Sequence, residues 1–332
     1  MPLTKVSYSM IQGAPVNVLD YGAYNDGTHA TETTAAFVAA FATGDAVYIP
    51  KGNYLVTGGL VLPETQRMFG DGPNQSIIEC DTSSFSGVCL TVGGRCEIRD
   101  FSVQAINYAN PPTATGIYFA SPDGPYSFTG HSSATNIRVM RFNVGFKVNN
   151  FFDLEFNLCE STYNNRGFEL TPYYSATTDS GYYTTITLSK CYIANNNLEG
   201  FYALSTINGR TLHFIDTAIE FNCVNTSTAV AEVYITRCYG VAFSSCYTES
   251  NPATTQPWLK LNDVSSAAIN DHWAQSTNGI DLGDYSAQLT MRNSVIGNLV
   301  GATTGATGQN IYAVGCSIGT TTIANTVYQR YI

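Results

Sequence analysis

The sequence predicts an all-β protein built as a right-handed parallel β-helix, a solenoid with a short capping helix near its N-terminus. Three observations support this fold class: a composition rich in strand-forming residues and poor in charge, two short motifs that recur along the chain, and apolar residues that alternate within each motif. Alternate side chains of a strand face opposite sides, so one alternating motif per coil gives a solenoid that is apolar inside and polar outside.

The composition limits both the fold and the partners. The chain has 332 residues, of which 44% are hydrophobic and only 12% charged, with 29 glycines, 22 tyrosines and 17 phenylalanines. This favours strands joined by polar turns around a large core. The net charge of −10, with no run of Lys or Arg, predicts that neither nucleic acid nor a membrane is a partner. Low charge with many tyrosines suits neutral, hydroxyl-rich ligands.

The cysteines predict no disulfide framework, no metal site and no cofactor. They are odd in number and show no C-x-x-C spacing, so we interpret them as buried small side chains of a protein that folds in a reducing cytoplasm. The start of the chain lacks the apolar stretch of a signal peptide, and no apolar run reaches membrane-spanning length. The nine cysteines are Cys80, Cys89, Cys96, Cys159, Cys191, Cys223, Cys238, Cys246 and Cys316.

The N-terminal part predicts a cap. "VNVLDYGAYNDGT" is typical of a strand and a loop, and the alanines that follow favour a helix over about 33–41, with Gly44 just past its end. Such a helix can plug the open end of a solenoid. "IPKGNY" predicts a turn with Gly52 and Asn53 at positive φ. The expected apolar face of the helix consists of Thr34, Phe37, Val38 and Phe41.

Two motifs organise the chain after about residue 140. The irregular spacing of the first favours a solenoid with variable loops over a helical array. It reads "GFKVNN" from 145, "GFELTP" from 167, "GFYALS" from 200, "AEVYIT" from 231, "PWLKLN" from 257 and "GIDLGD" from 279. The second reads "LEFNLCESTYNN" from 154, "ITLSKCYIANNN" from 186, "LHFIDTAIEFN" from 212, "VAFSSCYTESN" from 241 and "AAINDHWAQST" from 267.

Aligning the second motif on its apolar positions predicts columns of side chains that stack from coil to coil. Asparagines at the trailing end of each motif suit tight corners and can form ladders. A β-sandwich is the competing architecture, but it predicts hairpin turns every 8 to 12 residues and no such columns. The expected inward columns are Cys159, Cys191, Thr217, Cys246, His272 and Ser161, Ile193, Ile219, Thr248, Ala274. The expected outward columns are Glu160, Tyr192, Ala218, Tyr247, Trp273 and Thr162, Ala194, Glu220, Glu249, Gln275.

The alignment makes Glu220 and Glu249 neighbours on adjacent coils, and we expect them to be the catalytic pair. Glycosidic cleavage usually needs two carboxyl groups, about 5 Å apart in retaining enzymes and about 6.5 to 9.5 Å apart in inverting ones. Stacked carboxylates repel, which raises one pKa toward the range that a general acid requires. The plainer interpretation is that both acids are simply solvated on the outer face.

Other side chains complete the expected site. Asp216 and Asp271 bracket Ser245 at the corner and are further candidate acids, although both also suit a turn. We interpret His272 as a hydrogen-bonded core histidine. The insertions "DGPYSFTGH" and "DSGYYTT" could form groove walls or ordinary loops. The expected substrate contacts are Tyr247, Trp273, Gln275, Tyr192, Arg210 and His213.

Hydrolysis is favoured over two other chemistries. A lyase needs an acidic sugar, a cation to neutralise its carboxylate, and a base. The sequence offers no compact carboxylate cluster suited to calcium, and Lys190 is the only cation in the central corner column. A serine esterase has weak support, because the one G-x-S-x-G match, "GCSIG" from 315, lies in the expected β-helix body and not at a strand-to-helix turn.

The N-terminal motifs carry a family resemblance. "VNVLDYGAYNDGT", the alanine-rich helix, "AVYIPKGNYLV" and "FGDGPNQSII" resemble the opening coils of the pectate-lyase-like superfamily, particularly bacteriophage tailspikes and capsule depolymerases. "VSYSMIQGAPVNV" resembles the segment that joins a phage particle-binding region to the β-helix. The family often has an acidic pair before the capping helix, where "HATET" leaves Glu32 alone. We therefore expect a linker or docking segment at 1–16, the cap and first coils at 17–80, and the β-helix body at 81–332.

The resemblance implies a homotrimer that binds, and commonly cleaves, a bacterial surface polysaccharide such as a capsule, exopolysaccharide or O-antigen. It further implies a virion protein, made in the host cytoplasm and acting outside the cell, that is attached to a phage tail or baseplate protein through its N-terminus. It identifies no catalytic residue. A non-catalytic adhesin or structural tail component and a polysaccharide lyase stay open as alternatives.

Overall fold

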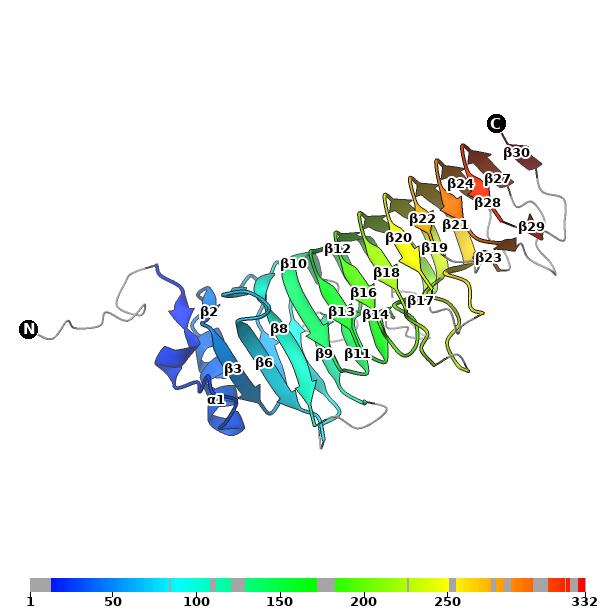
Figure 1. Ribbon diagram of the computed structural model, residues 1–332. Coiled ribbons are helices and arrows are strands. Elements are labelled where there is room, and N and C mark those ends of the chain that lie inside the picture. Colours follow the sequence, from blue (N-terminus) through cyan, green and yellow to red (C-terminus); the bar gives the residue numbers. More distant parts are fainter. Residues whose placement is uncertain are drawn as a thin grey trace, which may run out of the picture.

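The fold is a parallel β-helix. All strand pairings among the described residues are parallel, and the strands coil along one axis into an elongated stack, with helix α1 at one end and strand β30 at the other (Figure 1). This confirms the predicted fold class and excludes the sandwich, whose strands would be antiparallel. The computed structural model describes residues 13–83, 85–107, 112–120, 129–171, 183–225, 227–250, 255–275, 279–283, 288–300, 310–319, 321–322 and 328–331.

The N-terminal cap consists of β1 (Val16–Asn17), the 3-10 helix η2 (Val18–Tyr21) and α1 (Ala30–Phe41). Helix α1 contacts η2 and the first coils, as expected for a plug. It begins three residues before the predicted start, and its predicted face was wrong by one position. Val38 is 52% exposed, whereas Thr33 is buried and its hydroxyl accepts a hydrogen bond from the Tyr24 amide. The buried face consists of Thr33, Ala36, Phe37, Ala40 and Phe41.

The turn after β2 (Val47–Ile49) confirms one of two expected positive φ angles. Gly52 has a φ of 150°, and a Cβ atom there would lie 2.5 Å from Asn25. Asn53 instead has ordinary strand geometry within β3 (Gly52–Val56) and bridges to Asp26. Its side chain donates to Glu79, so Asn53 contributes to strand pairing and not to a left-handed turn.

Three parallel sheets form the faces of the helix, and β8, β10, β17, β19 and β21 each bend from one sheet into another. Sheet 1 contains β1, β2, β5 (Arg67–Gly70), β8 (Glu97–Ile106), β10 (Thr129–Met140), β12 (Phe151–Asn157), β15 (Thr184–Ser189), β17 (Phe201–Ile215), β19 (Val233–Ser244), β21 (Leu259–Asn270), β24 (Gln288–Arg292), β27 (Asn310–Val314) and β30 (Tyr328–Tyr331). Sheet 2 contains β3, β6 (Ser76–Asp81), the ends of β8 and β10, β13 (Glu160–Thr162), β16 (Tyr192–Ala194), β18 (Ala218–Glu220), β20 (Tyr247–Glu249), β22 (Trp273–Ala274), β25 (Val295–Ile296) and β28 (Ser317–Ile318). Sheet 3 contains β4 (Leu60–Leu62), β7 (Val88–Val92), β9 (Thr115–Phe119), β11 (Val144–Val148), β14 (Arg166–Leu170), the starts of β17, β19 and β21, β23 (Ile280–Leu282), β26 (Leu299–Val300) and β29 (Thr321–Thr322).

The two sequence motifs fall on these sheets as the alignment predicts. The first motif forms sheet 3, and the second forms the end of a sheet 1 strand followed by a sheet 2 strand. The two inward columns are buried. Two members of an outward column differ from the expectation, because Thr162 and Ala194 are buried as well. The Thr162 hydroxyl donates to the carboxylate of Glu160, so this small outward side chain is covered by a longer neighbour.

The corner between sheets 1 and 2 is a column of residues with left-handed backbone. From Leu158 to Asn293 the corner amide donates to a carbonyl of the next coil; Leu158, for example, donates to Ser189, and Asp216 to Ser244. Asn, Asp and Gly tolerate this backbone best, which explains their frequency here. The column consists of Asp100, Asn136, Leu158, Lys190, Asp216, Ser245, Asp271, Asn293 and Gly315.

Buried asparagines form the predicted ladder at the corner that follows sheet 2. The Asn196 side-chain oxygen accepts from the Asn164 amide at 3.0 Å, and the Asn222 side-chain oxygen accepts from the Asn196 side chain at 2.7 Å. The positive φ angles belong to the preceding residues, Tyr163 and Asn195, and not to the ladder itself. Asn251, at the end of the fourth copy of the motif, lies outside the described residues.

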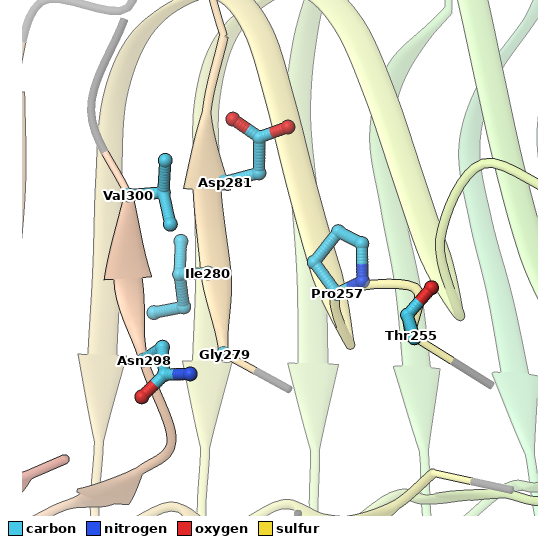
Figure 2. Close-up of a pocket in the computed structure, with 7 residues that line it drawn as sticks. All are labelled: Thr255, Pro257, Gly279, Ile280, Asp281, Asn298 and Val300. Carbon is cyan, nitrogen blue, oxygen red and sulfur yellow. The ribbon is translucent and has the colours of Figure 1, made fainter. Parts of the chain in front are cut away.

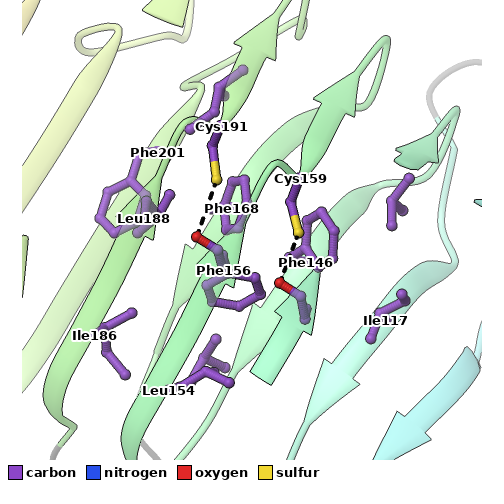
Figure 3. Packing of buried hydrophobic residues seen from close by; sticks show 14 of the residues in the cluster. Ile117, Phe146, Leu154, Phe156, Cys159, Phe168, Ile186, Leu188, Cys191 and Phe201 are labelled. Carbon is purple, nitrogen blue, oxygen red and sulfur yellow. Dashed lines mark hydrogen bonds between the residues drawn. The ribbon is translucent and has the colours of Figure 1, made fainter. Parts of the chain in front are cut away.

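The core is a continuous apolar stack (Figure 3). Phe146 stacks on Phe168 from the next coil with ring centroids 4.7 Å apart, and Phe156 packs edge-on against both. Thiols lie among these rings: Cys191 Sγ is 3.4 Å from the Phe156 carbonyl oxygen. All nine cysteines are free, and all are buried except Cys316, which is half-buried. This agrees with their interpretation as small core side chains. In the described part of the chain, no helix has the length and apolar character needed to cross a bilayer.

Candidate functional site

Glu220 and Glu249 stack on each other, as the sequence predicts. They end β18 and β20, and these two strands pair in register with Glu220 directly beside Glu249. Both side chains are half-buried on the outer face of sheet 2. Neighbouring parallel strands lie about 4.8 Å apart, so the two side chains leave the sheet at about that separation.

Tyrosine hydroxyls contact both carboxylates. The Tyr192 hydroxyl donates to Glu220 Oε2 at 3.3 Å, and the Tyr247 hydroxyl donates to Glu249 Oε2 at 2.6 Å. The Tyr247 oxygen also lies 2.7 Å from the side-chain oxygen position of Gln275. The Tyr247 hydroxyl therefore links the Glu249 carboxylate to the Gln275 side chain.

An aromatic column flanks the acids. Tyr192, Ala218, Tyr247 and Trp273 follow one another in register on β16, β18, β20 and β22. Trp273 is 59% exposed and Tyr192 is 38% exposed. An exposed indole and phenol beside two acids provide the mixed apolar and polar surface that a sugar ring fits.

The surroundings of Glu220 raise its pKa. Partial burial raises the pKa of Glu220, the Tyr192 hydroxyl opposes this shift, and the negative charge of Glu249 raises the pKa further. The hydrogen bond to Glu249 raises the pKa of Tyr247 to about 12, with a smaller effect from burial. Among the described side chains, no cation forms an ion pair with either glutamate. The pair therefore has one carboxyl that holds its proton longer than an ordinary glutamate does.

Asp216 and Asp271 occupy the left-handed corner column, with Ser245 between them as the alignment predicts. Their φ angles are 48° and 51°. The Asp271 carboxylate accepts a hydrogen bond from the Asn293 side chain at 3.3 Å. Their position suits a turn, and a role beside the glutamates stays a proposal.

The two remaining expected substrate contacts lie apart from the acid pair. His213 is on β17 in sheet 1, where it pairs with Thr187 and Ala242 on the neighbouring coils. Arg210 belongs to the same strand, but its side chain lies outside the described part of the structure. Most of the insertions "DGPYSFTGH" and "DSGYYTT" also lie outside the described residues.

His272 is a core histidine, as expected. It is 2% exposed, its Nε2 lies 3.1 Å from the Thr248 hydroxyl, and its ring stacks on Trp258 at 4.4 Å. Burial lowers its pKa to about 3, so the ring is neutral at physiological pH.

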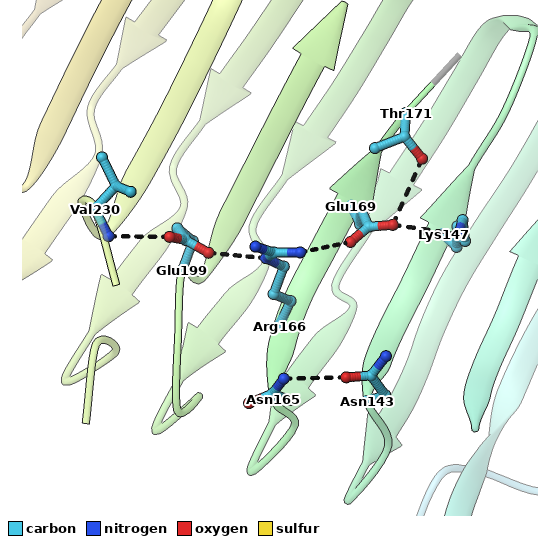
Figure 4. Close-up of polar contacts among 8 residues, drawn as sticks. All are labelled: Asn143, Lys147, Asn165, Arg166, Glu169, Thr171, Glu199 and Val230. Atoms are coloured by element: carbon cyan, nitrogen blue, oxygen red, sulfur yellow. Dashed lines mark hydrogen bonds and ion pairs between the residues drawn. The ribbon is translucent and has the colours of Figure 1, made fainter. Parts of the chain in front are cut away.

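A polar network on sheet 3 holds the main buried charges (Figure 4). The Arg166 guanidinium binds Glu199 at 2.8 Å and Glu169 at 3.0 Å, and Lys147 binds Glu169 from the preceding coil. Glu199 is 1% exposed and also accepts the Val230 amide. These bonds satisfy the buried carboxylates, so we assign the network to stability.

Two surface hollows were not expected from the sequence. One, of about 190 Å³, lies over the C-terminal coils of sheet 3 and is lined by Asp281, Asn298 and Val300 among others (Figure 2). Asp281 forms an ion pair with Lys260. The other, of about 400 Å³, lies on sheet 1 and contains His131, Asp153 and Glu155. "DLEF" from 153 carried a signal for it, since the two acids flank a buried leucine and so share the outer face. Within the described ranges, no three His, Cys, Asp or Glu side chains gather as metal ligands would.

Solved structures with the same fold include two phage tailspikes. The enzymatically active domain of tailspike protein 2 of bacteriophage CBA120 aligns with a TM-score of 0.58 and 14% identity over 92% of this chain and 42% of its own. The tailspike of Acinetobacter phage vb_AbaP_AS12 aligns with a TM-score of 0.63 and 14% identity over 95% of this chain and 61% of its own. The chain thus spans less than two thirds of either tailspike.

A glycoside hydrolase shares the fold too. The catalytic unit of the GH87 α-1,3-glucanase of Streptomyces thermodiastaticus aligns with a TM-score of 0.56 and 14% identity over 95% of this chain and 68% of its own. At these identities the structures establish the fold alone. No curated protein matches by sequence. A family model described as rhamnogalacturonase A/epimerase, pectate lyase-like, matches residues 15–244.

Proposed function

The chain belongs to the rhamnogalacturonase A/epimerase, pectate lyase-like family, and from this premise we propose that it binds and hydrolyses a bacterial surface polysaccharide. The substrate class is a capsule, an exopolysaccharide or an O-antigen. Glu220 is the general acid, and Glu249 is the nucleophile or general base.

The observation that carries this proposal is the in-register stacking of Glu220 on Glu249. The raised pKa of Glu220 suits the group that protonates the leaving oxygen, which leaves the role of nucleophile or general base to Glu249. A separation of about 4.8 Å is close to that of a retaining pair, in which the second carboxylate attacks the sugar directly.

The aromatic column beside the acids holds the sugar in this proposal. Tyr192 and Trp273 present exposed faces to a ring, while Tyr247 and Gln275 orient Glu249. Asp216 and Asp271 are second candidates for the acid. Arg210 and His213 are candidate contacts to more distant sugar residues.

The biological setting is part of the proposal. The tailspikes that share the fold support a place in a phage tail, with the protein made in the host cytoplasm and acting outside the cell. A tail or baseplate protein is the partner of the N-terminal segment. The assembly is a homotrimer, which would cover exposed apolar side chains such as Tyr163 and Val224 that a monomer leaves in water.

A non-catalytic adhesin is the second candidate. The observation that favours it is that Tyr192 and Tyr247 already donate to the two carboxylates, an arrangement that also suits fixed hydrogen-bond acceptors for sugar hydroxyls. Elimination by a lyase is the third reaction class, and its products distinguish it from hydrolysis.

The test is release of oligosaccharides from purified capsule, exopolysaccharide and lipopolysaccharide, measured as new reducing ends. Glu220→Gln and Glu249→Gln should each abolish release, while Glu32→Gln, at the exposed start of α1, should not. Folding raises the pKa of Glu220, so its ionised form is disfavoured in the native state at neutral pH, and Glu220→Gln should keep or raise the melting temperature.

Three outcomes separate the candidates. Retained release in both glutamine variants would remove the assignment of the acid pair. Binding of the wild-type protein to host cells without release from any polysaccharide would favour the adhesin, and products with the ultraviolet absorbance of unsaturated sugars would favour a lyase. Light scattering tests the trimer separately, and a monomeric mass would remove it.

A further inference from the structure

The 400 Å³ hollow on sheet 1 has the features of a binding site of its own. It spans three consecutive coils, β10, β12 and β15, and lies on a different face from the acid pair. We call it the sheet 1 hollow. The side chains that matter here are His131, Ser133, Asp153, Glu155, Thr185 and Thr187.

The backbone brings three of these side chains to one edge of the hollow. His131, Asp153 and Thr185 follow one another on successive coils, and all three have positive φ, at 58°, 51° and 37°. Because the same bend recurs at the same place in each coil, the three side chains leave the sheet in similar directions. The edge is thus built by the repeat and does not depend on one loop.

His131 is held in place on two sides. Its Nδ1 lies 3.1 Å from the Asp153 carboxylate, and the edge of its ring packs against Phe152 with centroids 5.1 Å apart. In the neutral ring, Nδ1 donates to Asp153 and Nε2 becomes an acceptor. No described residue bonds to Nε2, so this nitrogen is available to a hydroxyl donor.

Glu155 lies at the centre of a column of hydroxyl-bearing residues. Glu155 pairs with Ser133 on one side and with Thr187 on the other, and His213 follows Thr187 on the next coil. The Glu155 side chain is exposed, and among the described residues nothing bonds to its carboxylate. A carboxylate accepts hydrogen bonds well, and a threonine hydroxyl both donates and accepts.

The charge of the sheet 1 hollow indicates the kind of ligand. Two carboxylates against one histidine make it acidic overall, which disfavours an acidic sugar. Its acceptors and hydroxyls match the hydroxyl groups of a neutral one. This complementarity is absent from the core side of the strands, where Leu154 and Phe156 are buried.

We propose that the sheet 1 hollow binds a neutral sugar residue, with Glu155 and Nε2 of His131 accepting its hydroxyls and Thr187 donating to it. Asp153 is a positioning residue that fixes the histidine ring. This inference rests on the proposed function: the sheet 1 hollow is a second contact for the same polysaccharide, which would continue around the corner from sheet 2. His213 extends the contact surface by one coil. It takes no part in bond cleavage.

The test measures affinity for the methyl glycosides of glucose, galactose, mannose and rhamnose by saturation-transfer difference NMR on the full chain. Glu155→Ala should weaken binding about tenfold, the effect of losing one hydrogen bond to a charged acceptor. Thr187→Val should weaken it as well. The matched control is Thr290→Val, because Thr290 occupies the same column four coils further along.

Two results would overturn the site: no binding of any neutral glycoside by the wild-type protein, or equal affinities in Glu155→Ala, Thr187→Val and Thr290→Val. Tighter binding of methyl glucuronide or of glucosamine than of the neutral glycosides would overturn the ligand class. Circular dichroism and melting of each variant exclude unfolding as the cause of a loss.

The same variants distinguish this inference from the proposed function. On a polysaccharide that the protein cleaves, Glu155→Ala should raise KM about tenfold and leave kcat unchanged. Glu220→Gln should abolish cleavage and leave glycoside binding intact. If no polysaccharide is cleaved, the glycoside measurement still decides whether the sheet 1 hollow is a site.

Discussion

Tyr192 controls the proton of Glu220 at the scale of the single residue. Its hydroxyl donates to the carboxylate at 3.3 Å and thereby lowers a pKa that burial and Glu249 raise. Tyr192→Phe removes that donor, so the ionised form loses stabilisation and the pKa of Glu220 should rise further. Carbon-13 NMR titration of the glutamate carboxyls measures the shift, and Glu220→Gln assigns the signal.

The control for this prediction is Tyr312→Phe. Tyr312 is a partly exposed tyrosine of sheet 1, on a different face from the two acids, so its loss should leave the titration of Glu220 unchanged. If Glu220 is the general acid, the alkaline limb of the pH–rate profile should shift to higher pH in Tyr192→Phe, because the pKa of Glu220 rises. A titration midpoint that stays constant or falls would contradict the assigned role of the hydroxyl.

Individual residues were predictable where the repeat determines their position. Glu220 and Glu249 could be paired from sequence because both follow the same inward apolar residues at the same offset. His131 and Asp153 could not, because their approach depends on a left-handed bend that alternation does not encode. The outward orientation of Glu155 could be predicted from the alternation, but its role in the hollow depends on its neighbours on the two adjacent coils.

The corners are the elements that fix where each sheet ends. Leu158 has a φ of 55° and a side chain that is 53% exposed, so it bears the strain of left-handed backbone with little burial in return. The left-handed conformation costs an L-residue about 1–2 kcal/mol, and glycine avoids this strain. Glycine also increases the entropy of the unfolded state, which offsets part of the gain. Leu158→Gly should therefore stabilise the protein by about 1 kcal/mol in denaturant unfolding.

Ser189→Gly is the matched control for the corner. Ser189 lies one position before the corner of the next coil, in ordinary strand geometry within β15. Glycine there should destabilise the protein by roughly 0.5–1 kcal/mol. Equal effects of the two substitutions would show that the corner backbone is not the source of the strain.

The asparagine ladder is the second element that the coils share. Asn196 is fully buried, and its side chain bonds to the Asn164 amide, the Ser161 carbonyl and Asn222. Asn196→Ala leaves several of these groups unpaired inside the protein, so it should cost on the order of 3 kcal/mol of unfolding free energy. Asn197→Ala changes a neighbouring residue outside the ladder and should stay within about 0.5 kcal/mol. A small effect at Asn196 would mean that water replaces its bonds.

The helix and strands were predicted correctly where apolar and polar residues alternate clearly. The strands of the second motif were placed in register because cysteine, isoleucine and phenylalanine alternate there with polar residues. Helix α1 was misplaced by one position because alanine and threonine give little contrast between its faces: Thr33 is buried through a hydrogen bond, and Val38 is exposed.

The architecture of the whole molecule results from the stacking of similar coils. Each coil contacts mainly the coils before and after it, so the architecture could be predicted from one repeating pattern without any long-range information. The two hollows could not, because a hollow depends on where small and large side chains meet across coils. Thr162 and Ala194 show the same limit, since neighbouring side chains and not their own strand positions bury them.

The buried thiols of the core can report local unfolding, because each thiol becomes reactive only when its coil opens. Burial raises the pKa of Cys246 to about 11 and that of Cys159 well above its usual range, so neither offers a reactive thiolate while its coil is closed. In the native protein, iodoacetamide should alkylate Cys316 first, since it is the least buried thiol. Under mild denaturant, mass spectrometry of the order in which Cys80, Cys159 and Cys246 react should then reveal from which end the coils separate. Prompt alkylation of Cys159 in buffer would mean that the middle of the stack opens on its own.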